Sequence, residues 1–232
     1  ADLLASLDVP AFKVASGDAT NIPLITHIAT FGKPMIISTG GSSIQEVDRI
    51  YEAMSASGTP FALLQCSCIY PAPAEVLNLR VISTYLERYP EIPTGLSTHN
   101  PEIASTLAAY TLGGRIFEHH YTNDRDWLGT DNNFSITPTT LAKLVEGLAE
   151  IRVSLGSADK VRWPVEDDYT IERRKKLVWT RDIEVGSTIQ PGDLTAKCPG
   201  DGVFPWEKDR IVGTKLLNIA TAESDVLGSD MG

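Results

Sequence analysis

Two patterns of apolar and polar positions alternate along residues 1–156. Short apolar runs predict five β-strands, and each run is followed by apolar residues at helical spacing. The predicted strands lie at 11–16, 34–38, 61–66, 94–97 and 115–121. Because strands and helices alternate, the pattern predicts an α/β fold in which helical crossovers join parallel strands. On pattern alone, a doubly wound sheet and a piece of a barrel fit equally well.

Two of the predicted helices have clear start signals. Ser43 is followed three positions later by Glu46, which is the capping-box spacing, and an apolar face follows it. Thr137 and Pro138 predict the start of a long helix whose apolar face runs from Leu141 to Leu155. The predicted strands are almost wholly apolar, as in a sheet that is buried on both faces.

The character of the sequence changes after Gly156. Residues 157–175 are rich in charge and lack strong periodicity, so we predict a linker. Its basic run, Arg173–Lys176, is typical of a solvated face, with a phosphate-binding patch as the less frequent alternative. From residue 176 to 232, short apolar runs between Gly- and Pro-containing turns predict a second, small, β-rich domain.

Composition excludes several classes of function. The formal net charge of −10 argues against nucleic acid and anionic membrane surfaces as partners. No apolar run is long enough to cross a membrane, and no P-loop or Gly-x-Gly-x-x-Gly motif occurs. Cys66, Cys68 and Cys198 have neither the number nor the spacing of a disulfide framework or a zinc knuckle. We therefore expect a protein of a reducing, cytoplasmic setting.

Each predicted strand ends in groups that can bind ligands or move protons. They are Lys13, Ser16, Asp18, Ser38, Thr39, Tyr70, Ser97, His99, Glu118 and His120, with Asp124, Asp126 and Asp131 in the loop beyond the last strand. A lysine with hydroxyls and glycine-rich turns predicts a phosphate cradle. Two imidazoles with nearby carboxylates predict a site for a divalent cation. Taken alone, the two histidines are equally well explained as unrelated structural residues on turns.

The motifs around these residues resemble, in order and spacing, those of the sialic acid synthases, also called N-acetylneuraminate synthases. The matching segments are Phe12-Lys-Val-Ala-Ser-Gly-Asp18, Ile37-Ser-Thr-Gly40, Leu64-Gln-Cys-Ser-Cys-Ile-Tyr-Pro71, Asn78-Leu-Arg80, Gly95-Leu-Ser-Thr-His99, Phe117-Glu-His-His-Tyr-Thr122 and Gly129-Thr-Asp131. Residues 176–232 are similar to the SAF, or antifreeze-like, domain of the same enzymes, through Asp182-Ile183, Gly186, Leu194-Thr195 and Pro199-Gly-Asp-Gly202.

This resemblance implies a TIM (β/α)8-type barrel followed by an SAF domain, and a condensation reaction. Phosphoenolpyruvate would add to an N-acylated mannosamine-type sugar, giving a sialic acid and phosphate. The resemblance assigns His99 and His120 to a divalent metal, manganese in the first place, with magnesium or cobalt as alternatives. It assigns catalytic roles to Glu118, Tyr70 and Asp18, and substrate contacts to Lys13, Ser16, Ser38, Ser97 and Asp131. It also implies a homodimer in which the tail domain of one subunit lies over the barrel of the other.

Two departures from the family pattern qualify these expectations. Cys198 stands where the family commonly has an arginine that reaches the N-acyl group of the sugar, so the sugar is left open. A barrel has eight strand–helix units, and five are predicted here. The resemblance implies three further units before the strand of Lys13, so we expect a longer protein and no condensation by residues 1–232 alone. The alternatives are a synthase for another nonulosonic or octulosonic acid, and a non-catalytic fragment or binding module.

Overall fold

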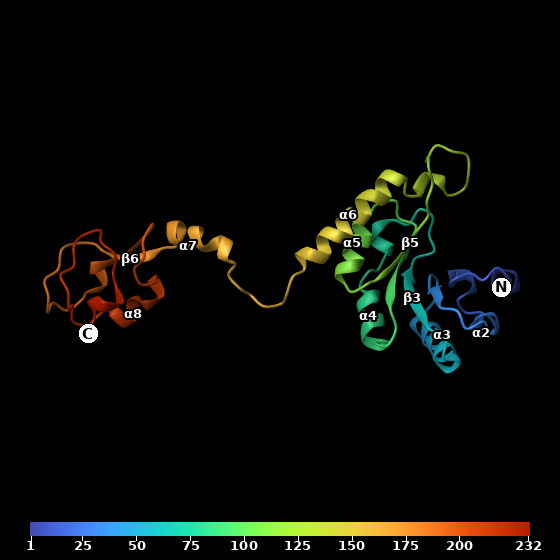
Figure 1. Ribbon diagram of the computed structural model, residues 1–232, viewed down its shortest axis with the longest axis horizontal. Helices are drawn as coiled ribbons and strands as arrows, with labels where there is room; N and C mark the ends of the chain where they lie inside the picture. The colour runs from blue at the N-terminus through green and yellow to red at the C-terminus, as the bar shows by residue number, and fades with distance from the viewer. The chain divides into compact units, whose positions relative to one another are not determined.

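A computed structural model describes residues 1–232 as two units, Ala1–Gly156 and Ser157–Gly232 (Figure 1). In the first unit, five strands form one parallel sheet in the order β1-β2-β3-β4-β5. The strands are β1 Phe12–Val14, β2 Met35–Ser38, β3 Phe61–Cys66, β4 Thr94–Thr98 and β5 Ile116–His119. This order lacks the reversal that a doubly wound sheet contains. Of the two folds left open by the pattern, the sheet therefore has the strand order of a barrel segment.

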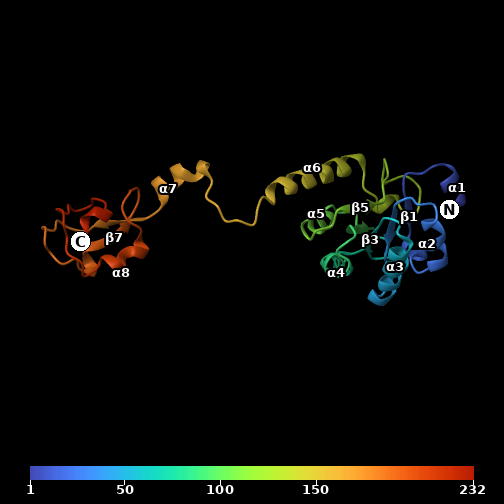
Figure 2. The same ribbon diagram turned by 60° about the horizontal axis from the view of Figure 1, so that its bottom comes forward.

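Helices connect consecutive strands and lie around one side of the curled sheet (Figure 2). They are α2 Ile22–Ala29, α3 Ile44–Ser57, α4 Val81–Arg88 and α5 Ala104–Thr111. Helix α4 packs on β3 and β4, and α5 packs on β4 and on the long helix α6, Pro138–Ser154. The chain opens with the short helix α1, Asp2–Ser6. Nowhere in residues 1–232 does a helix combine the length and apolarity that crossing a membrane requires.

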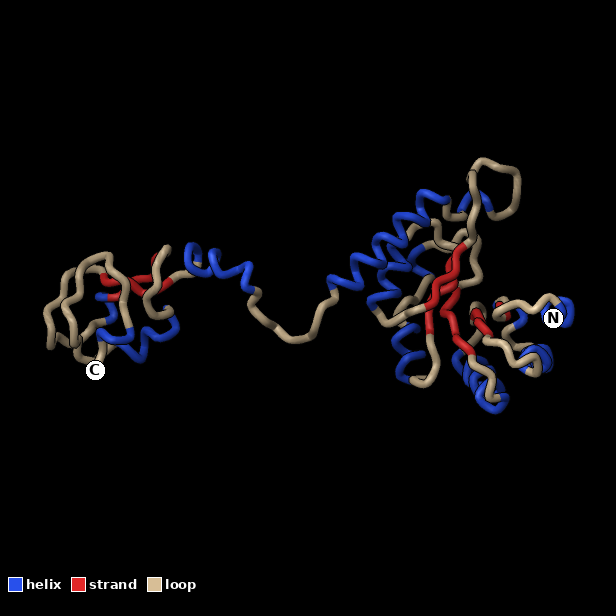
Figure 3. Tube along the Cα trace, viewed as in Figure 1, coloured by secondary structure: helices blue, strands red, loops and turns tan.

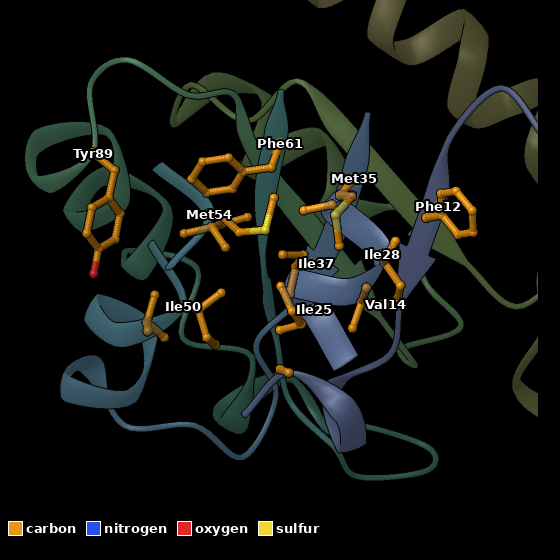
Figure 4. Close-up of a cluster of buried hydrophobic side chains, with 14 of the residues drawn as sticks. Phe12, Val14, Ile25, Ile28, Met35, Ile37, Ile50, Met54, Phe61 and Tyr89 are labelled. Atoms are coloured by element: carbon orange, nitrogen blue, oxygen red, sulfur yellow. The ribbon is translucent and has the colours of Figure 1, made fainter. Parts of the chain in front are cut away.

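The main core of the first unit lies between β1 to β3 and helices α2 and α3 (Figure 4). It is formed by apolar side chains at strand and helix spacing: Phe12, Val14, Ile25, Ile28, Met35, Ile37, Ile50, Met54, Phe61 and Tyr89. Ile25, Ile37, Ile50 and Met54 are completely buried. Since burial of one such side chain contributes about 1.5–3 kcal/mol, this cluster is a main source of stability for the sheet.

The predicted capping box at the start of α3 is present. The backbone N–H of Ser43 donates to Glu46 Oε2 at 2.7 Å, and the N–H of Glu46 donates to Ser43 Oγ at 3.4 Å. Two backbone donors that the helix leaves unpaired are thereby satisfied. Gly58, with φ of 70°, ends the helix in the left-handed conformation that glycine adopts readily.

The structure differs from the predicted burial in three elements. All residues of β3 and β4 are buried, but every residue of β5 is only half-buried, because β5 is an edge strand. On α6, only Leu144 is buried, and both Leu141 and Leu155 are exposed. The spacing of Leu3, Leu4 and Leu7 likewise predicts an apolar helix face within residues 1–9, and in the structure all three side chains, on α1 and directly after it, are exposed. Helical periodicity identified these two helices but did not show whether a neighbour covers their apolar side.

Loops and turns make up most of the second unit (Figure 3). Strands β6 Lys176–Trp179 and β7 Leu194–Lys197 pair antiparallel, with the short helix α8 Lys208–Ile211 after them. Buried side chains give this unit its own core: Leu177, Trp179, Ile183, Ile189, Leu194, Ile211, Leu216, Ala220 and Val226. Within 157–175, where a linker was predicted, the chain forms helix α7, Asp167–Arg173.

Gly95 marks a close approach between β4 and β5. It lies opposite Ile116 in the parallel register, and a Cβ atom on Gly95 would lie 1.7 Å from the carbonyl oxygen of Ile116. Since that neighbour is backbone, the strand pair would have to separate to admit a side chain. Only glycine is compatible with this spacing.

We predict that Gly95→Ala lowers the free energy of unfolding of the first unit by about 2–4 kcal/mol, because it forces β5 away from β4. Urea denaturation of the parent and the variant measures the difference. Gly17→Ala is the matched control, since a Cβ there meets nothing within 4 Å. Equal stability of the Gly95→Ala protein and the parent would contradict the close approach.

Candidate active site

A cavity of about 290 Å³ lies at the carboxyl ends of the parallel strands. It is lined by Lys13, Ala15, Ser16, Ser38, Cys66, Tyr70, Ser97, Thr98, His99, Glu118, His119 and His120. The register explains this convergence, because it places Cys66 beside Ser97 and Ser97 beside Glu118. Side chains that are far apart in the sequence thus share one cavity.

Of the ten residues to which the resemblance assigns a role, eight line this cavity and two do not, and the other polar groups named with them, Thr39, Asp124 and Asp126, do not line it either. Asp131 lies at its edge, where one of its carboxylate oxygens contacts the His120 ring. Asp18 is exposed in the short turn Ser16–Asp18 and is not among the lining residues. The structure therefore does not bring Asp18 together with the other predicted site residues.

One side of the cavity is rich in hydrogen-bond donors. Lys13 Nζ, Ser38 Oγ and Ser97 Oγ lie 3.3, 3.2 and 2.6 Å from Oε2 of Glu118. Ser16 Oγ accepts the backbone N–H of Gly40 at 2.9 Å. We call Lys13, Ser16, Ser38 and Ser97 the donor cradle. One ammonium group and three hydroxyls are chemically suited to hold a phosphate or carboxylate group.

Gly40 allows the turn after β2 to approach this cradle. A Cβ atom on Gly40 would lie 2.4 Å from Cys68 Sγ and 2.9 Å from Ser16 Oγ. No side chain fits there without moving Ser16. The glycine of the Ser-Thr-Gly turn therefore has a steric role in the cradle.

The two histidines predicted as metal ligands lie together on the other side of the cavity, with ring centroids 5.1 Å apart. His99 Nδ1 lies 3.0 Å from the carbonyl oxygen of Ser67. Since a carbonyl only accepts, His99 Nδ1 carries the hydrogen, and Nε2 of the neutral ring keeps its lone pair. Burial lowers the pKa of His99 below its ordinary value of 6.5, which favours that neutral form.

His120 is oriented in a similar way by a carboxylate. Its Nδ1 atom lies 3.3 Å from Asp131 Oδ2, which directs Nε2 away from the carboxylate. The ring of Tyr70 lies against that of His99, with centroids 3.8 Å apart, and approaches His120 edge-on, with centroids 6.0 Å apart. The two imidazoles are thus fixed by a carbonyl, a carboxylate and an aromatic ring.

The chemistry of these donors fits a divalent ion in part. Metal-bound histidines usually donate their second ring N–H to a carbonyl or carboxylate, as His99 does, and His120 Nδ1 lies within ion-pair distance of a carboxylate. Within residues 1–232, however, no group of three or more His, Cys, Asp or Glu side chains is placed to hold a metal. An ion bound here by the two imidazoles would need oxygen atoms of water or substrate to complete its coordination.

His119 is directed away from this pair. Its Nε2 atom lies 2.7 Å from Thr106 Oγ1, on helix α5 behind the sheet. Burial lowers the pKa of His119 to about 4, so the ring is neutral at pH 7. The alternation of side chains along an extended chain separates His119 from His120, although they are adjacent in the sequence.

Some groups of the site were not among the predicted residues. The Cys66 thiol lies against Ser16 and Ser97, next to the cradle. Burial raises the pKa of this thiol, so it stays protonated. The carbonyl of Ser67 orients His99. A backbone group of this kind gives no signal in the sequence, because any residue could supply it. The position of Cys66 at the end of a strand was the one available indication.

The chain is similar in sequence to known proteins of one family. The model of the NeuB family matches residues 1–160. The human N-acetylneuraminate-9-phosphate synthase is 35% identical over 231 residues, covering 99% of this chain and 64% of that protein. The N,N'-diacetyllegionaminic acid synthase of Campylobacter jejuni is 31% identical, covering 91% of this chain and 64% of that protein.

A solved structure shows a similar fold. The N-acetylneuraminic acid synthetase of Leptospira borgpetersenii, solved in complex with citrate, superposes with a TM-score of 0.67 at 34% identity. The match covers 72% of this chain and 59% of that one. The chain therefore spans less than two thirds of the length of these three relatives.

We predict that His120→Ala weakens Mn²⁺ binding at least about tenfold, because it removes one of the two Nε2 atoms that would bind the metal. Isothermal titration calorimetry of the full chain at pH 7 measures the affinity. His119→Gln is the matched control, since the neighbouring ring contacts Thr106. If His120→Ala binds Mn²⁺ as tightly as the parent, the pair is not a metal site.

We predict that the His119 ring of the metal-free chain titrates near pH 4. An unfolded chain takes up this proton near pH 6.5, so the unfolded state binds more protons between pH 6.5 and 4. The contribution of His119 to the free energy of unfolding therefore falls as the pH falls through this window. The ring-proton chemical shift, followed by NMR, gives the midpoint, and a midpoint near 6.5 would contradict the burial.

Proposed function

The chain belongs to the NeuB family, and we propose that it provides the active site of a nonulosonic acid synthase. The proposed reaction joins phosphoenolpyruvate to an N-acylated mannosamine-type sugar and releases phosphate. The observation that carries this proposal is the convergence of two groups of side chains in one cavity. The cavity is lined both by the donor cradle and by the histidine pair, whose two Nε2 atoms make no hydrogen bond. The names of the synthases matched above support the same class of product.

In the proposed reaction the donor cradle binds the phosphate of phosphoenolpyruvate. Lys13 supplies the positive charge, and Ser16, Ser38 and Ser97 supply hydroxyl donors. Lys13 Nζ also donates to the carbonyl of Val14 at 2.8 Å, and this hydrogen bond holds the ammonium group near the carboxyl end of β1. A charged donor fixed in this way binds a phosphate better than a mobile surface lysine does, because less side-chain entropy is lost.

The sugar aldehyde would bind on the histidine side. His99 and His120 would hold a divalent ion, which we propose to be manganese, with magnesium or cobalt as substitutes. A bound ion of this kind supplies Lewis-acid polarisation of a carbonyl oxygen. The carbonyl of Ser67 keeps His99 in the tautomer that leaves Nε2 available, and Asp131 contacts the Nδ1 side of His120. Tyr70 and Asp131 are proposed to face the sugar.

The atoms balance as follows. C3 of phosphoenolpyruvate forms a bond to the aldehyde carbon, and the aldehyde oxygen takes a proton and becomes a hydroxyl. A water oxygen bonds to C2, and the water loses a proton. The bond from C2 to the phosphate oxygen then breaks, the hydroxyl left on C2 gives up its remaining proton, and phosphate leaves with that proton as C2 becomes a ketone. We propose that Glu118, whose carboxylate lines this cavity within hydrogen-bond distance of Ser97, exchanges these protons.

The proposal extends to the identity of the sugar and to the assembly of two copies of the protein. In the second unit Lys175 Nζ lies 3.1 Å from Cys198 Sγ, so a cationic donor stands beside the position where the family commonly has an arginine. We propose that this unit contacts the N-acyl group of a sugar bound by the partner copy in a homodimer. Such an arrangement would let Lys175 replace part of the missing guanidinium.

The test of function uses a protein that contains the chain in full. We expect phosphate release from phosphoenolpyruvate that depends on both N-acetylmannosamine and Mn²⁺, with a new carbon–carbon bond visible by NMR on ¹³C-labelled substrate. Other N-acylated hexosamines serve as alternative acceptors. Phosphoenolpyruvate that remains intact with every acceptor would contradict the proposed reaction.

We predict that Lys13→Ala weakens phosphoenolpyruvate binding by about 1.5–3 kcal/mol, the usual loss for a hydrogen bond to a charged group. Isothermal titration calorimetry measures the change. Lys33→Ala is the matched control, because Lys33 pairs with Asp8 at 2.7 Å, outside the cavity. Equal losses in the two variants would show that net charge, and not the cradle, determines the affinity.

A further inference from the structure

One oxygen atom of Glu118 occupies the centre of the donor cradle. Lys13 Nζ, Ser38 Oγ and Ser97 Oγ all lie within 3.3 Å of Oε2, and they approach from three different strands. The second oxygen, Oε1, accepts no hydrogen bond within residues 1–232. Glu118 is thus bound in the cradle through a single oxygen atom, as one oxygen of a phosphate would be.

A carboxylate in this position is incompatible with a phosphate in the same place. Two anions a few ångströms apart repel each other strongly in a partly desolvated cavity. The two serine hydroxyls also cannot serve two acceptors, since each donates only one hydrogen, so only the ammonium of Lys13 has hydrogens left to share. Either the phosphate stays out of the cradle or Glu118 leaves it.

The side chains of the donor cradle keep other contacts when Glu118 leaves. Lys13 Nζ is held by the carbonyl of Val14, and Ser16 Oγ is held by the N–H of Gly40, in both cases without any help from Glu118. Ser97 is buried on β4, and Ser38 is buried at the end of β2. Glu118, by contrast, lies on the half-buried edge strand β5 and has no other partner for its carboxylate.

We propose that Glu118 is an internal occupant of the phosphate site, which the substrate displaces on binding. This inference rests on the proposed function, because it takes the cradle to be the site for the phosphate of phosphoenolpyruvate. In the free protein the carboxylate neutralises Lys13 and keeps the serine hydroxyls directed at one point. When the phosphate binds, it takes over these donors. The carboxylate then turns toward His99 and His120, which line the same cavity.

The test is calorimetric titration of the full chain with inorganic phosphate and, separately, with phosphoenolpyruvate. Glu118→Gln keeps the shape of the side chain and removes the competing charge, so we expect roughly tenfold tighter binding of both ligands. Glu118→Ala, which removes the competitor altogether, is a second variant and should also bind more tightly. Asp126→Asn is the matched control, because it removes one negative charge from an exposed loop residue that does not line the cavity.

A thermal readout accompanies the titration. Without ligand, Glu118→Gln should unfold at a lower temperature than the parent, because Lys13 and the two serines lose their charged acceptor. Phosphate should then raise its midpoint more than it raises that of the parent, since ligand binding stabilises the folded state in proportion to affinity.

The outcomes separate the inference from the function. Tighter binding by both Glu118 variants, with Asp126→Asn unchanged, supports displacement. If the parent binds the ligands and the Glu118 variants bind them equally well or more weakly, displacement is wrong. The cradle would still be the binding site in that case. Equal tightening by Asp126→Asn also overturns it, because the effect would then be one of net charge. If none of these proteins binds phosphate or phosphoenolpyruvate, the cradle and the inference are both wrong.

Discussion

The parallel register of β1 to β5 is the constraint on which the site depends. A parallel sheet with consecutive strand order brings the carboxyl end of every strand to one edge. The hydrogen bonds of the ladder place Ser97 opposite Glu118, so the shortest polar contact of the cavity is an indirect product of backbone pairing. Gly95 belongs to the same constraint, because only a residue without a side chain lets β4 and β5 pair at this distance. Chemistry and strand packing therefore cannot be changed independently here.

The sequence predicted much of the fold, because the signals that it carries are local. Apolar runs identified all five strands, and the Ser43–Glu46 spacing identified the start of α3. Burial was predicted less well, because it depends on what lies beyond each element. Strand β5 has the composition of a buried strand but lies at the edge of the sheet, and α6 has an apolar stripe of which only Leu144 is buried.

The site was predictable to the extent that it consists of side chains at strand ends. The polar residues of five strands indicated a common cavity, and the resemblance to the sialic acid synthases supplied their expected roles. Contacts between side chains were not predictable. Nothing in the sequence places Glu118 in the cradle formed by Lys13 and the serines, or turns His119 toward Thr106 while His120 faces Asp131. These contacts depend on rotamers and on neighbours from distant parts of the chain.

The two histidines differ in how open they are to evolutionary adjustment. His99 is oriented by the carbonyl of Ser67, a main-chain atom that persists whatever residue stands at position 67. His120 is oriented by the carboxylate of Asp131, which a single substitution can shorten, lengthen or neutralise. The orientation of one imidazole is therefore set by the path of the backbone, whereas that of the other depends on a loop side chain. A substitution at position 131 would free one ring of the pair to turn, while the sheet and the other ring stay as they are.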